Sequence, residues 1–240
     1  MTLIQSKAFL KLLTGLLCIV VSAFVALQAN DEIIIYTEDY HPYSYVDEQG
    51  RIVGLSTDIV RKIMYESGLS YTIRLVPWAR AYREVVSGDN TLVFSLARLK
   101  EREADFDWLA YLVRPEFYIF VKDTETRIVS VEGLKNGDFT AVCVVEDISC
   151  VLLRQMGFPE HKFLKKRDGG LSGSDMIAYG RADLYVGDII HHQINPRGNK
   201  AKVKPVMRVG EGVGLYLASG LQLDKRIREK IRTAAMKLSR

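Results

Sequence analysis

The chain has 240 residues, 48% of them hydrophobic and 26% charged, with a formal net charge of +4. This composition is typical of an ordinary globular protein with a sizeable core, and it excludes the fibrous and intrinsically disordered classes. The weak charge, without a basic tract, argues against nucleic acid as a partner. The length fits one large domain or two small lobes.

The first 29 residues resemble a secretory signal peptide. Lys7 and Lys11 form a short basic region, and the apolar run that follows reaches a small residue at Ala29. Leu27 is the weaker point, because a small side chain is preferred three residues before the cut. The alternative is an uncleaved anchor that begins near Leu12. Since the rest of the sequence has no further apolar run of membrane length, we expect an exported, periplasmic protein.

Export would place Cys143 and Cys150 in an oxidising compartment, where a disulfide between them is chemically feasible. The two residues flank a predicted strand-to-helix turn. Two buried free thiols are the alternative, because a strand and a helix can hold the Cα atoms too far apart for a bridge. The sequence leaves both interpretations open.

Short apolar runs alternate with segments of helical periodicity, and this alternation predicts an α/β fold with mostly parallel sheets. The clearest helix is predicted at 56–67, where Ser56 or Thr57 can cap the first turn and Asp58 suits the positive end of the helix dipole. Strands are predicted at Ile33–Thr37, Tyr71–Val76, Thr91–Leu96, Tyr118–Lys122, Phe139–Val145, Asp183–Gly187 and Gly214–Ala218, and further helices at Ala79–Ser87, Ser149–Met156, Ser174–Tyr179 and Asp224–Leu238.

The predicted units form two groups, which the polar stretch Asp123–Arg127 separates. A second polar stretch, Asn195–Lys204, ends the second group, and one more strand and a long helix follow. This order predicts two lobes joined by two crossings. We expect a signal peptide at 1–29, a first lobe at 30–122, a second lobe at 123–205 and a return to the first lobe at 206–240.

Polar side chains follow most of the predicted strands. Ligands of open α/β sheets bind beyond the carboxyl ends of the strands, so these residues are candidates for a binding site. Together they offer cations for a carboxylate, acids for an ammonium group and aromatic walls, although ordinary loop polarity explains any one of them. The candidates are Glu38, Asp39, Tyr40, Trp78, Arg80, Ser95, Arg98, Arg102, Glu146, Asp147 and Asp188.

The sequence predicts neither a metal site nor a cofactor. His191 and His192 are adjacent and cannot both face one ion from a regular element, whereas His41 and His161 are isolated. The glycines of "GEGVG" at 210–214 precede a strand rather than join a strand to a helix, so they do not match the dinucleotide-binding fingerprint.

Three motifs resemble those of family 3 periplasmic solute-binding proteins, the polar amino acid class that serves ABC importers and also occurs as sensor domains. "YTEDYHPYSYVDEQGRIVGLSTDIVRKI" resembles the opening strand, aromatic-proline loop and first helix of this family. "SLARLKEREADFDWLAYL" and "GRADLYVGD" are similar to two later motifs. The resemblance covers nearly the whole mature chain. It implies a type II periplasmic-binding-protein-like fold, in which two α/β lobes, each a mostly parallel sheet flanked by helices, are joined by a two-crossing hinge.

The resemblance also implies roles for individual residues. Arg102 would bind a ligand α-carboxylate and Asp188 an α-ammonium group. Asp39 and Tyr40 would face the cleft, whereas we expect Tyr43 and Tyr45 to pack against the first lobe. Trp78 would form a second wall, and Ser95 and Ala97 would offer backbone groups.

Two departures from the family pattern leave the ligand class open. Ala97 and Arg98 replace a more typical serine and apolar residue. "VVEDIS", which contains Glu146, lacks the glycine and threonine that commonly hold the carboxylate from the second lobe. Because Arg80 and Arg98 add positive charge, a dicarboxylate or a peptide-like solute is an alternative to an amino acid.

We expect a non-enzymatic, monomeric protein whose lobes close over a small polar solute and deliver it to an ABC transporter permease or a membrane sensor. The competing hypothesis is an enzyme on the same scaffold, similar to a cyclohexadienyl dehydratase, with Glu146 or Glu38 as general acid. Binding of the solute without its turnover would distinguish the two.

The exported form should begin near Asn30, because the apolar segment ends there and Asp31 and Glu32 begin a polar surface. The intact mass of the secreted protein measures this start. A membrane-held product that retains Met1 would show an anchor instead.

Overall fold

The computed structural model describes residues 32–166, 171–194, 202–210 and 212–238. The predicted signal segment, its cut after Ala29 and most of the second polar stretch lie outside the described residues. Within the described ranges, no helix combines the length and the apolar character that a membrane span requires.

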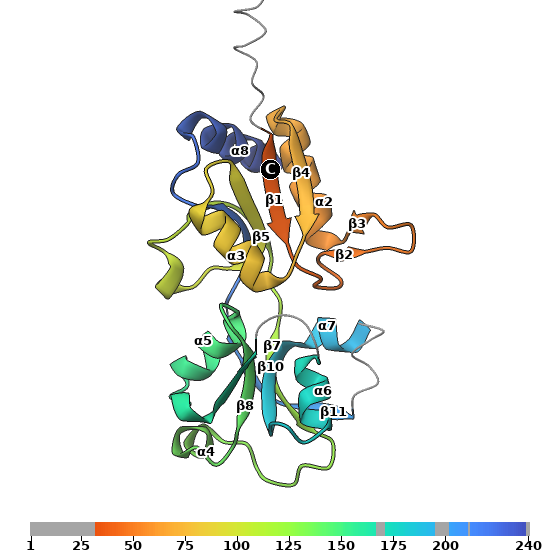
Figure 1. The fold of residues 1–240 in the computed structure, drawn as a ribbon, viewed down its shortest axis with the longest axis vertical. Helices are drawn as coiled ribbons and strands as arrows, with labels where there is room; N and C mark the ends of the chain where they lie inside the picture. The colour runs from red at the N-terminus through yellow and green to blue at the C-terminus, as the bar shows by residue number, and fades with distance from the viewer. Residues whose placement is uncertain (1–31, 167–170, 195–201, 211, 239–240) are drawn as a thin grey trace, which may run out of the picture. The chain divides into compact units, whose positions relative to one another are not determined.

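Two five-stranded sheets form the centre of the fold (Figure 1). The first has the strand order β4-β1-β5-β12-β6, and the second has the order β11-β7-β10-β8-β9. A small hairpin, β2–β3, follows β1. The strands are β1 (Ile33–Thr37), β2 (Tyr45–Val46), β3 (Ile52–Val53), β4 (Tyr71–Leu75), β5 (Thr91–Ala97), β6 (Asp107–Val113), β7 (Phe117–Lys122), β8 (Ala141–Val144), β9 (Phe163–Lys166), β10 (Leu184–Asp188), β11 (Val203–Val209) and β12 (Leu215–Ser219).

Helices pack against both sheets and complete two α/β lobes. We call the first sheet and its helices the first lobe, and the second sheet and its helices the second lobe. The first lobe contains α2 (Leu55–Ser67), α3 (Trp78–Ser87), α8 (Lys225–Leu238) and the short 3-10 helix Lys100–Arg102. The second contains α4 (Val131–Asn136), α5 (Ile148–Gln155), α6 (Gly173–Ala178), α7 (Ile189–Ile194) and the 3-10 helix Glu160–Lys162.

Each sheet is mixed, and this corrects the expectation of mostly parallel sheets. In the first sheet β1 runs parallel to β4 and β5, whereas β12 runs antiparallel to β5 and β6. In the second, β8 runs parallel to β9 and β10, whereas β7 runs antiparallel to β10 and β11. The reason is the connection between the sheets. Strands β7 and β12 each enter their sheet from the other lobe, at the side where β10 and β5 end, so each runs antiparallel to that neighbour.

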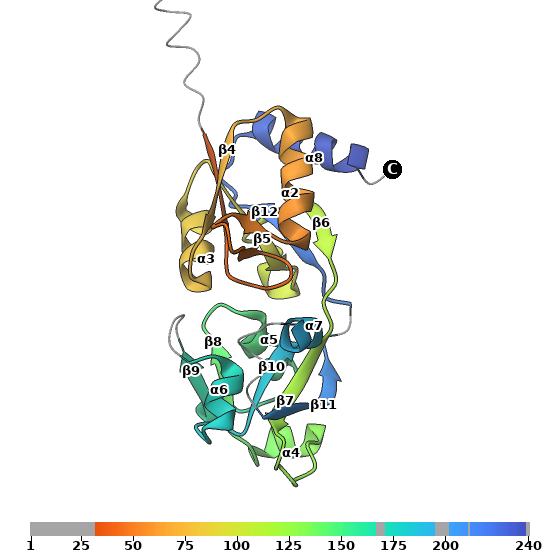
Figure 2. The same ribbon diagram turned by 90° about the vertical axis from the view of Figure 1, so that its right-hand side faces the viewer.

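The chain crosses between the sheets at different positions from those expected. It leaves the first sheet after β6 and enters the second at β7, so the first crossing is Arg114–Glu116 (Figure 2). This crossing precedes the polar stretch Asp123–Arg127. The return lies between β11 and β12 and contains Gly210, Gly212 and Gly214, whereas the expected boundary after residue 205 falls inside β11.

Strand β1 has no polar face because it is buried on both sides. Ile33 and Ile35 pack into one cluster with side chains of α2 and α8, whereas Ile34 and Tyr36 pack against the cluster that contains α3. Full burial of each such side chain contributes roughly 1.5–3 kcal/mol. A continuous apolar run is therefore the sequence that a central strand between two helical layers requires.

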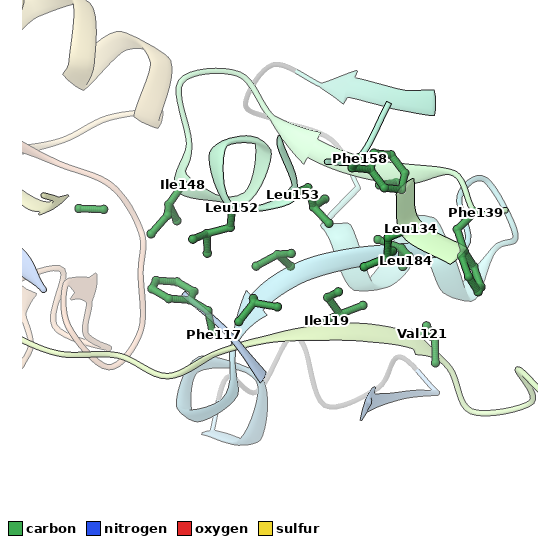
Figure 3. Close-up of a cluster of buried hydrophobic side chains, with 14 of the residues drawn as sticks. Phe117, Ile119, Val121, Leu134, Phe139, Ile148, Leu152, Leu153, Phe158 and Leu184 are labelled. Atoms are coloured by element: carbon green, nitrogen blue, oxygen red, sulfur yellow. The ribbon is translucent and has the colours of Figure 1, made fainter. Parts of the chain in front are cut away.

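The core of the second lobe continues into the first lobe through Ala97, Leu99 and Leu215 (Figure 3 shows the second-lobe part). Phe117, Ile119 and Val121 lie on one face of β7, as the two-residue period of a strand requires. They share a cluster with Leu153 of α5 and Leu184 of β10. Further clusters lie within the first lobe and within the second, so each lobe also buries apolar side chains by itself.

Helix α2 begins without a side-chain cap, contrary to the expectation for Ser56 or Thr57. Both residues are buried, and their backbone N–H groups donate to the carbonyl of Tyr43 at 3.0 and 3.2 Å. The loop can approach this closely because Gly54 has no side chain. A Cβ at Gly54 would lie 2.5 Å from the Tyr43 carbonyl oxygen, and the φ of +130° is unfavourable for other residues.

Gly54→Ala should lower the free energy of unfolding by about 2–3 kcal/mol, because both the backbone conformation and the Tyr43 contact are lost. Gly50→Ala is the matched control, since Gly50 also has a positive φ of +76° but open space around its Cβ position. The control should cost only about 1 kcal/mol. Urea unfolding measures both, and equal losses would show that the contact with Tyr43 is unimportant.

Candidate functional site

A cavity of about 190 Å³ lies where the carboxyl ends of strands from both lobes meet. Its volume is below the roughly 300 Å³ that pockets for drug-sized ligands begin with, so it fits a small solute. Both lobes supply lining residues, and Glu38, Asp147 and His191 are among them. The candidate residues of the sequence that line it are Glu38, Asp39, Tyr40, Trp78, Ser95, Ala97, Arg102, Asp147 and Asp188.

Arg102 brings a buried guanidinium to the cavity from the first lobe. The residue is 5% exposed, and it donates to the carbonyl of Ala97 at 3.2 Å and to that of Glu146 at 2.5 Å. Its guanidinium also lies 5.4 Å from the centre of the Tyr82 ring. Burial lowers the pKa of Arg102. Among the described residues no carboxylate forms an ion pair with it, and a guanidinium has five N–H donors, so it retains donors for an anion.

Asp188 brings a buried carboxylate to the cavity from the end of β10. It is 3% exposed and accepts hydrogen bonds from the backbone N–H groups of Ile190 at 3.1 Å and His191 at 3.4 Å. Tyr43 of the first lobe also donates to it. Burial raises the pKa of Asp188 despite these hydrogen bonds. The preference for simple packing of Tyr43 against the first lobe was therefore incomplete, because its hydroxyl reaches the second lobe.

Aromatic rings from both lobes enclose one side of the cavity. The Tyr40 ring lies edge-on to Tyr43, with 4.9 Å between the centroids, and 5.4 Å from the ring of His191. His191 Nδ1 lies 2.6 Å from the His41 carbonyl oxygen, which is a further contact between the lobes. Burial lowers the pKa of His191. The pKa of Tyr40 is raised, mainly by burial and to a smaller extent by the negative charge of Asp188.

Ser95 presents an unsatisfied polar atom at the cavity. Its hydroxyl is buried and has no hydrogen-bond partner in the described part of the chain. The backbone of Ser95 adopts a φ of 62°, which is uncommon for a residue other than glycine. Buried polar atoms are normally paired in folded proteins, so the Ser95 hydroxyl is a hydrogen-bonding group that remains available at the cavity.

Glu146 contributes a carbonyl rather than a carboxylate. Its side chain is exposed and does not line the cavity, so the structure does not place it as the general acid that the enzyme alternative requires. Its carbonyl oxygen accepts a hydrogen bond from Trp78 Nε1 at 2.8 Å as well as the one from Arg102. A disulfide joins Cys143 and Cys150, one on each side of this turn.

The structure does not bring Arg80 or Arg98 to the cavity. Arg80 is exposed and pairs with a glutamate one turn later on α3. Arg98 pairs with Glu103 at 2.7 Å and lies 5.3 Å from the ring centres of both Trp108 and Tyr216. The positive charge that the sequence suggested is therefore absent from the lining, which combines Arg102 with the carboxylate residues Glu38, Asp39, Asp147 and Asp188.

Several lining residues were not predicted as ligand contacts. Tyr185 lies in β10, three residues before Asp188, and His191 lies in α7, three residues after it. Phe117 and Leu215 reach the cavity because they begin the strands that follow the two crossings. Because the sequence predicts the crossings at two polar stretches elsewhere in the chain, nothing in the sequence marks Phe117 or Leu215 as close to the cavity. In the described ranges, no group of His, Cys, Asp and Glu residues could hold a metal ion.

The comparisons with known proteins agree with this architecture. No curated protein sequence matches the chain. The chain resembles a histidine kinase sensor domain with similarity to periplasmic binding proteins, with a TM-score of 0.74, 17% identity and coverage of 88% of this chain and 91% of the other. An ancestral arginine-binding protein bound to arginine matches with a TM-score of 0.71 and 21% identity, and the match covers 87% of this chain and 92% of that protein. The arginine-, lysine-, histidine-binding protein ArtJ from Geobacillus stearothermophilus matches with a TM-score of 0.72 and 13% identity, and the match covers 87% of this chain and 90% of ArtJ.

These likenesses establish the fold, and the sequence itself establishes the family. The model of the bacterial extracellular solute-binding proteins, family 3, matches residues 33–234, which is most of the chain. The two α/β lobes are the arrangement that the resemblance of the three motifs implied, although their sheets are mixed rather than mostly parallel. The chain belongs to the bacterial extracellular solute-binding proteins, family 3.

Proposed function

We propose that this protein binds a small amino acid or a related carboxylate between its lobes, in the periplasm, without chemical turnover. The observation that carries the proposal is that Arg102 and Asp188 line the same cavity from opposite lobes. A guanidinium holds a carboxylate through two parallel hydrogen bonds, and a buried carboxylate pairs with an ammonium group. An amino acid carries both groups on one carbon atom.

The charge of the lining favours an amino acid with a cationic side chain. Four carboxylate residues line the cavity with Arg102, whereas Arg80 and Arg98 point elsewhere. A dicarboxylate would meet one guanidinium and several like charges, and like-charge contacts in a desolvated site cost several kcal/mol. The arginine-binding proteins among the solved structures support the same choice.

Closure of the lobes supplies the mechanism. A ligand that contacts Arg102 and Asp188 gains interactions with both lobes only when they are together, so it shifts the population toward the closed form. Tyr40 and Trp78 then cover the solute, and the Ser95 hydroxyl gains a partner. The closed form is the state that a membrane partner would recognise.

We infer that the partner is an ABC importer or a membrane sensor. The apolar N-terminal segment supports export, and one solved structure of the same fold is a histidine kinase sensor domain. A thermal-shift screen of amino acids, dicarboxylates and short peptides identifies the solute. Mass spectrometry of the bound solute over hours then tests turnover, and a changed mass would favour the enzyme alternative.

Arg102→Ala should weaken binding of the solute that the screen identifies by about 30-fold or more. Loss of one partner of a desolvated charge pair costs roughly 2–5 kcal/mol, and each 1.4 kcal/mol is about tenfold in affinity. Arg98→Ala is the matched control, because Arg98 follows the same strand but lies outside the cavity. This variant should bind the solute with wild-type affinity. Calorimetric titration measures both, and near-wild-type affinity for Arg102→Ala would refute this site.

Asp188→Ala should weaken binding to a similar degree when the solute carries an ammonium group. The reason is that Asp188 is the buried carboxylate at the second-lobe side of the cavity. Unchanged affinity for Asp188→Ala together with loss for Arg102→Ala would identify an anionic solute without an ammonium group, contrary to the charge argument above.

Asp188→Asn should raise Tm at pH 7 although it weakens binding. Because burial raises the pKa of Asp188 in the folded protein, its contribution to stability is complete below the unfolded pKa of about 4 and is lost as pH rises through the folded pKa. The neutral amide avoids this loss, so the difference in Tm should shrink as pH falls toward 4. A lower Tm for Asp188→Asn at pH 7 would show that the hydrogen bonds from Tyr43 and α7 outweigh burial.

A further inference from the structure

One main-chain carbonyl joins the lobes directly. The Glu146 oxygen in the second lobe accepts hydrogen bonds from Trp78 Nε1 at 2.8 Å and from an Arg102 Nη atom at 2.5 Å, both in the first lobe. Trp78 is 3% exposed and Arg102 is 5% exposed, so these donors are hidden from water. A buried donor without an acceptor is costly, and the carbonyl therefore matters to both side chains.

The direction of this carbonyl depends on an unfavourable backbone conformation. Glu146 adopts a φ of 63°, in the left-handed region that residues with a side chain seldom occupy. Such conformations persist only where the surrounding structure holds them. The exposed side chain of Glu146 does not provide this restraint, so it must come from the rest of the turn.

A disulfide, a helix cap and two backbone hydrogen bonds restrain the turn. The hydrogen bonds run from the Asp147 N–H to the Val144 carbonyl at 3.2 Å and from the Val145 N–H to the Lys166 carbonyl at 3.0 Å. Cys143 lies in β8 and Cys150 in the first turns of α5, and their disulfide closes the segment between them, which has a sequence separation of 7. Both cysteines are buried, at 2% and 3% exposure. Inside this closed segment, the Asp147 carboxylate caps α5 by accepting from the backbone N–H of Ser149 at 2.8 Å.

We propose that the Cys143–Cys150 disulfide positions the Glu146 carbonyl toward Trp78 and Arg102, and that this carbonyl holds the two lobes together. The disulfide would then act on the site through the turn, without contact with the solute. A solute carboxylate would compete with the carbonyl for Arg102, so the turn also sets how readily the solute is accepted. The two donors and the acceptor all belong to this chain, so the inference does not depend on the identity of the solute.

Trp78 can report this contact by fluorescence because the sequence contains only two tryptophans. In a Trp108→Phe background Trp78 is the sole indole. Adding Cys143→Ala and Cys150→Ala should shift its emission to longer wavelength and increase its quenching by acrylamide, since the indole loses its acceptor and its cover. The measurement uses the full exported chain without solute, so it stands even when the proposed ligand is wrong.

A Trp78→Phe background supplies the control for the fold. It leaves Trp108, whose indole N–H has no hydrogen-bond partner among the described residues. The cysteine substitutions should leave Trp108 emission and the far-ultraviolet circular dichroism unchanged. Titration of free thiols in the denatured, unreduced parent should find none, and reactive thiols there would overturn the proposal.

Substitution of Glu146 tests the turn while the disulfide stays intact. Glu146→Val should shift Trp78 emission as the cysteine substitutions do, because a β-branched residue is a genuine outlier at this φ. Glu146→Gly is the matched control and should cause no shift, since glycine accepts the left-handed conformation. When the cysteine variant does not fold, this pair decides alone. Unchanged Trp78 emission in a folded Glu146→Val protein would overturn the proposal.

Discussion

The site depends on how two buried first-lobe donors, the Trp78 indole and the Arg102 guanidinium, find acceptors. A guanidinium removed from water without partners is costly, and no carboxylate within the described ranges pairs with Arg102. Main-chain carbonyls at Ala97 and Glu146 satisfy it instead. Because a neutral carbonyl compensates a cation less fully than a carboxylate does, the guanidinium is held in place but remains able to attract an anion.

The opposite wall is organised on the same principle with reversed charge. The Asp188 carboxylate is held by two backbone N–H groups of α7 and by Tyr43, all of them neutral donors. Each charged group is therefore oriented by dipoles, and the described part of the chain supplies neither of them with an ion-pair partner. Under the proposed function, a zwitterionic solute would supply both counter-ions at once.

The sequence predicted the parts of the fold whose burial is regular. Strand β1 is buried on both faces and reads as a run of isoleucines, and α2 was expected to within one residue. Several elements were missed. Strand β6 has register shifts where it pairs with β12, and β9 is an edge strand in which Leu164 and Lys165 are exposed. Strand β11 contains Pro205 at an edge, and α4 and α7 have six residues each. None of these gives a clear hydrophobic period. At the site, Arg98 was misplaced because sequence position does not reveal which way a side chain turns after a strand ends.

The two crossings differ in the chemistry of their backbones, and this difference has a mechanical consequence. The first, Arg114–Glu116, contains a proline, whose ring fixes one of its two backbone angles. The second contains Gly210 and Gly212 with φ values of 65° and 80°, in a region where glycine moves at little cost. The first crossing is therefore the stiffer of the two, and the second is more flexible at its glycines. When the lobes separate, the backbone angles of the glycine-containing crossing should change most. The lobes would then rotate about an axis near the proline-containing crossing.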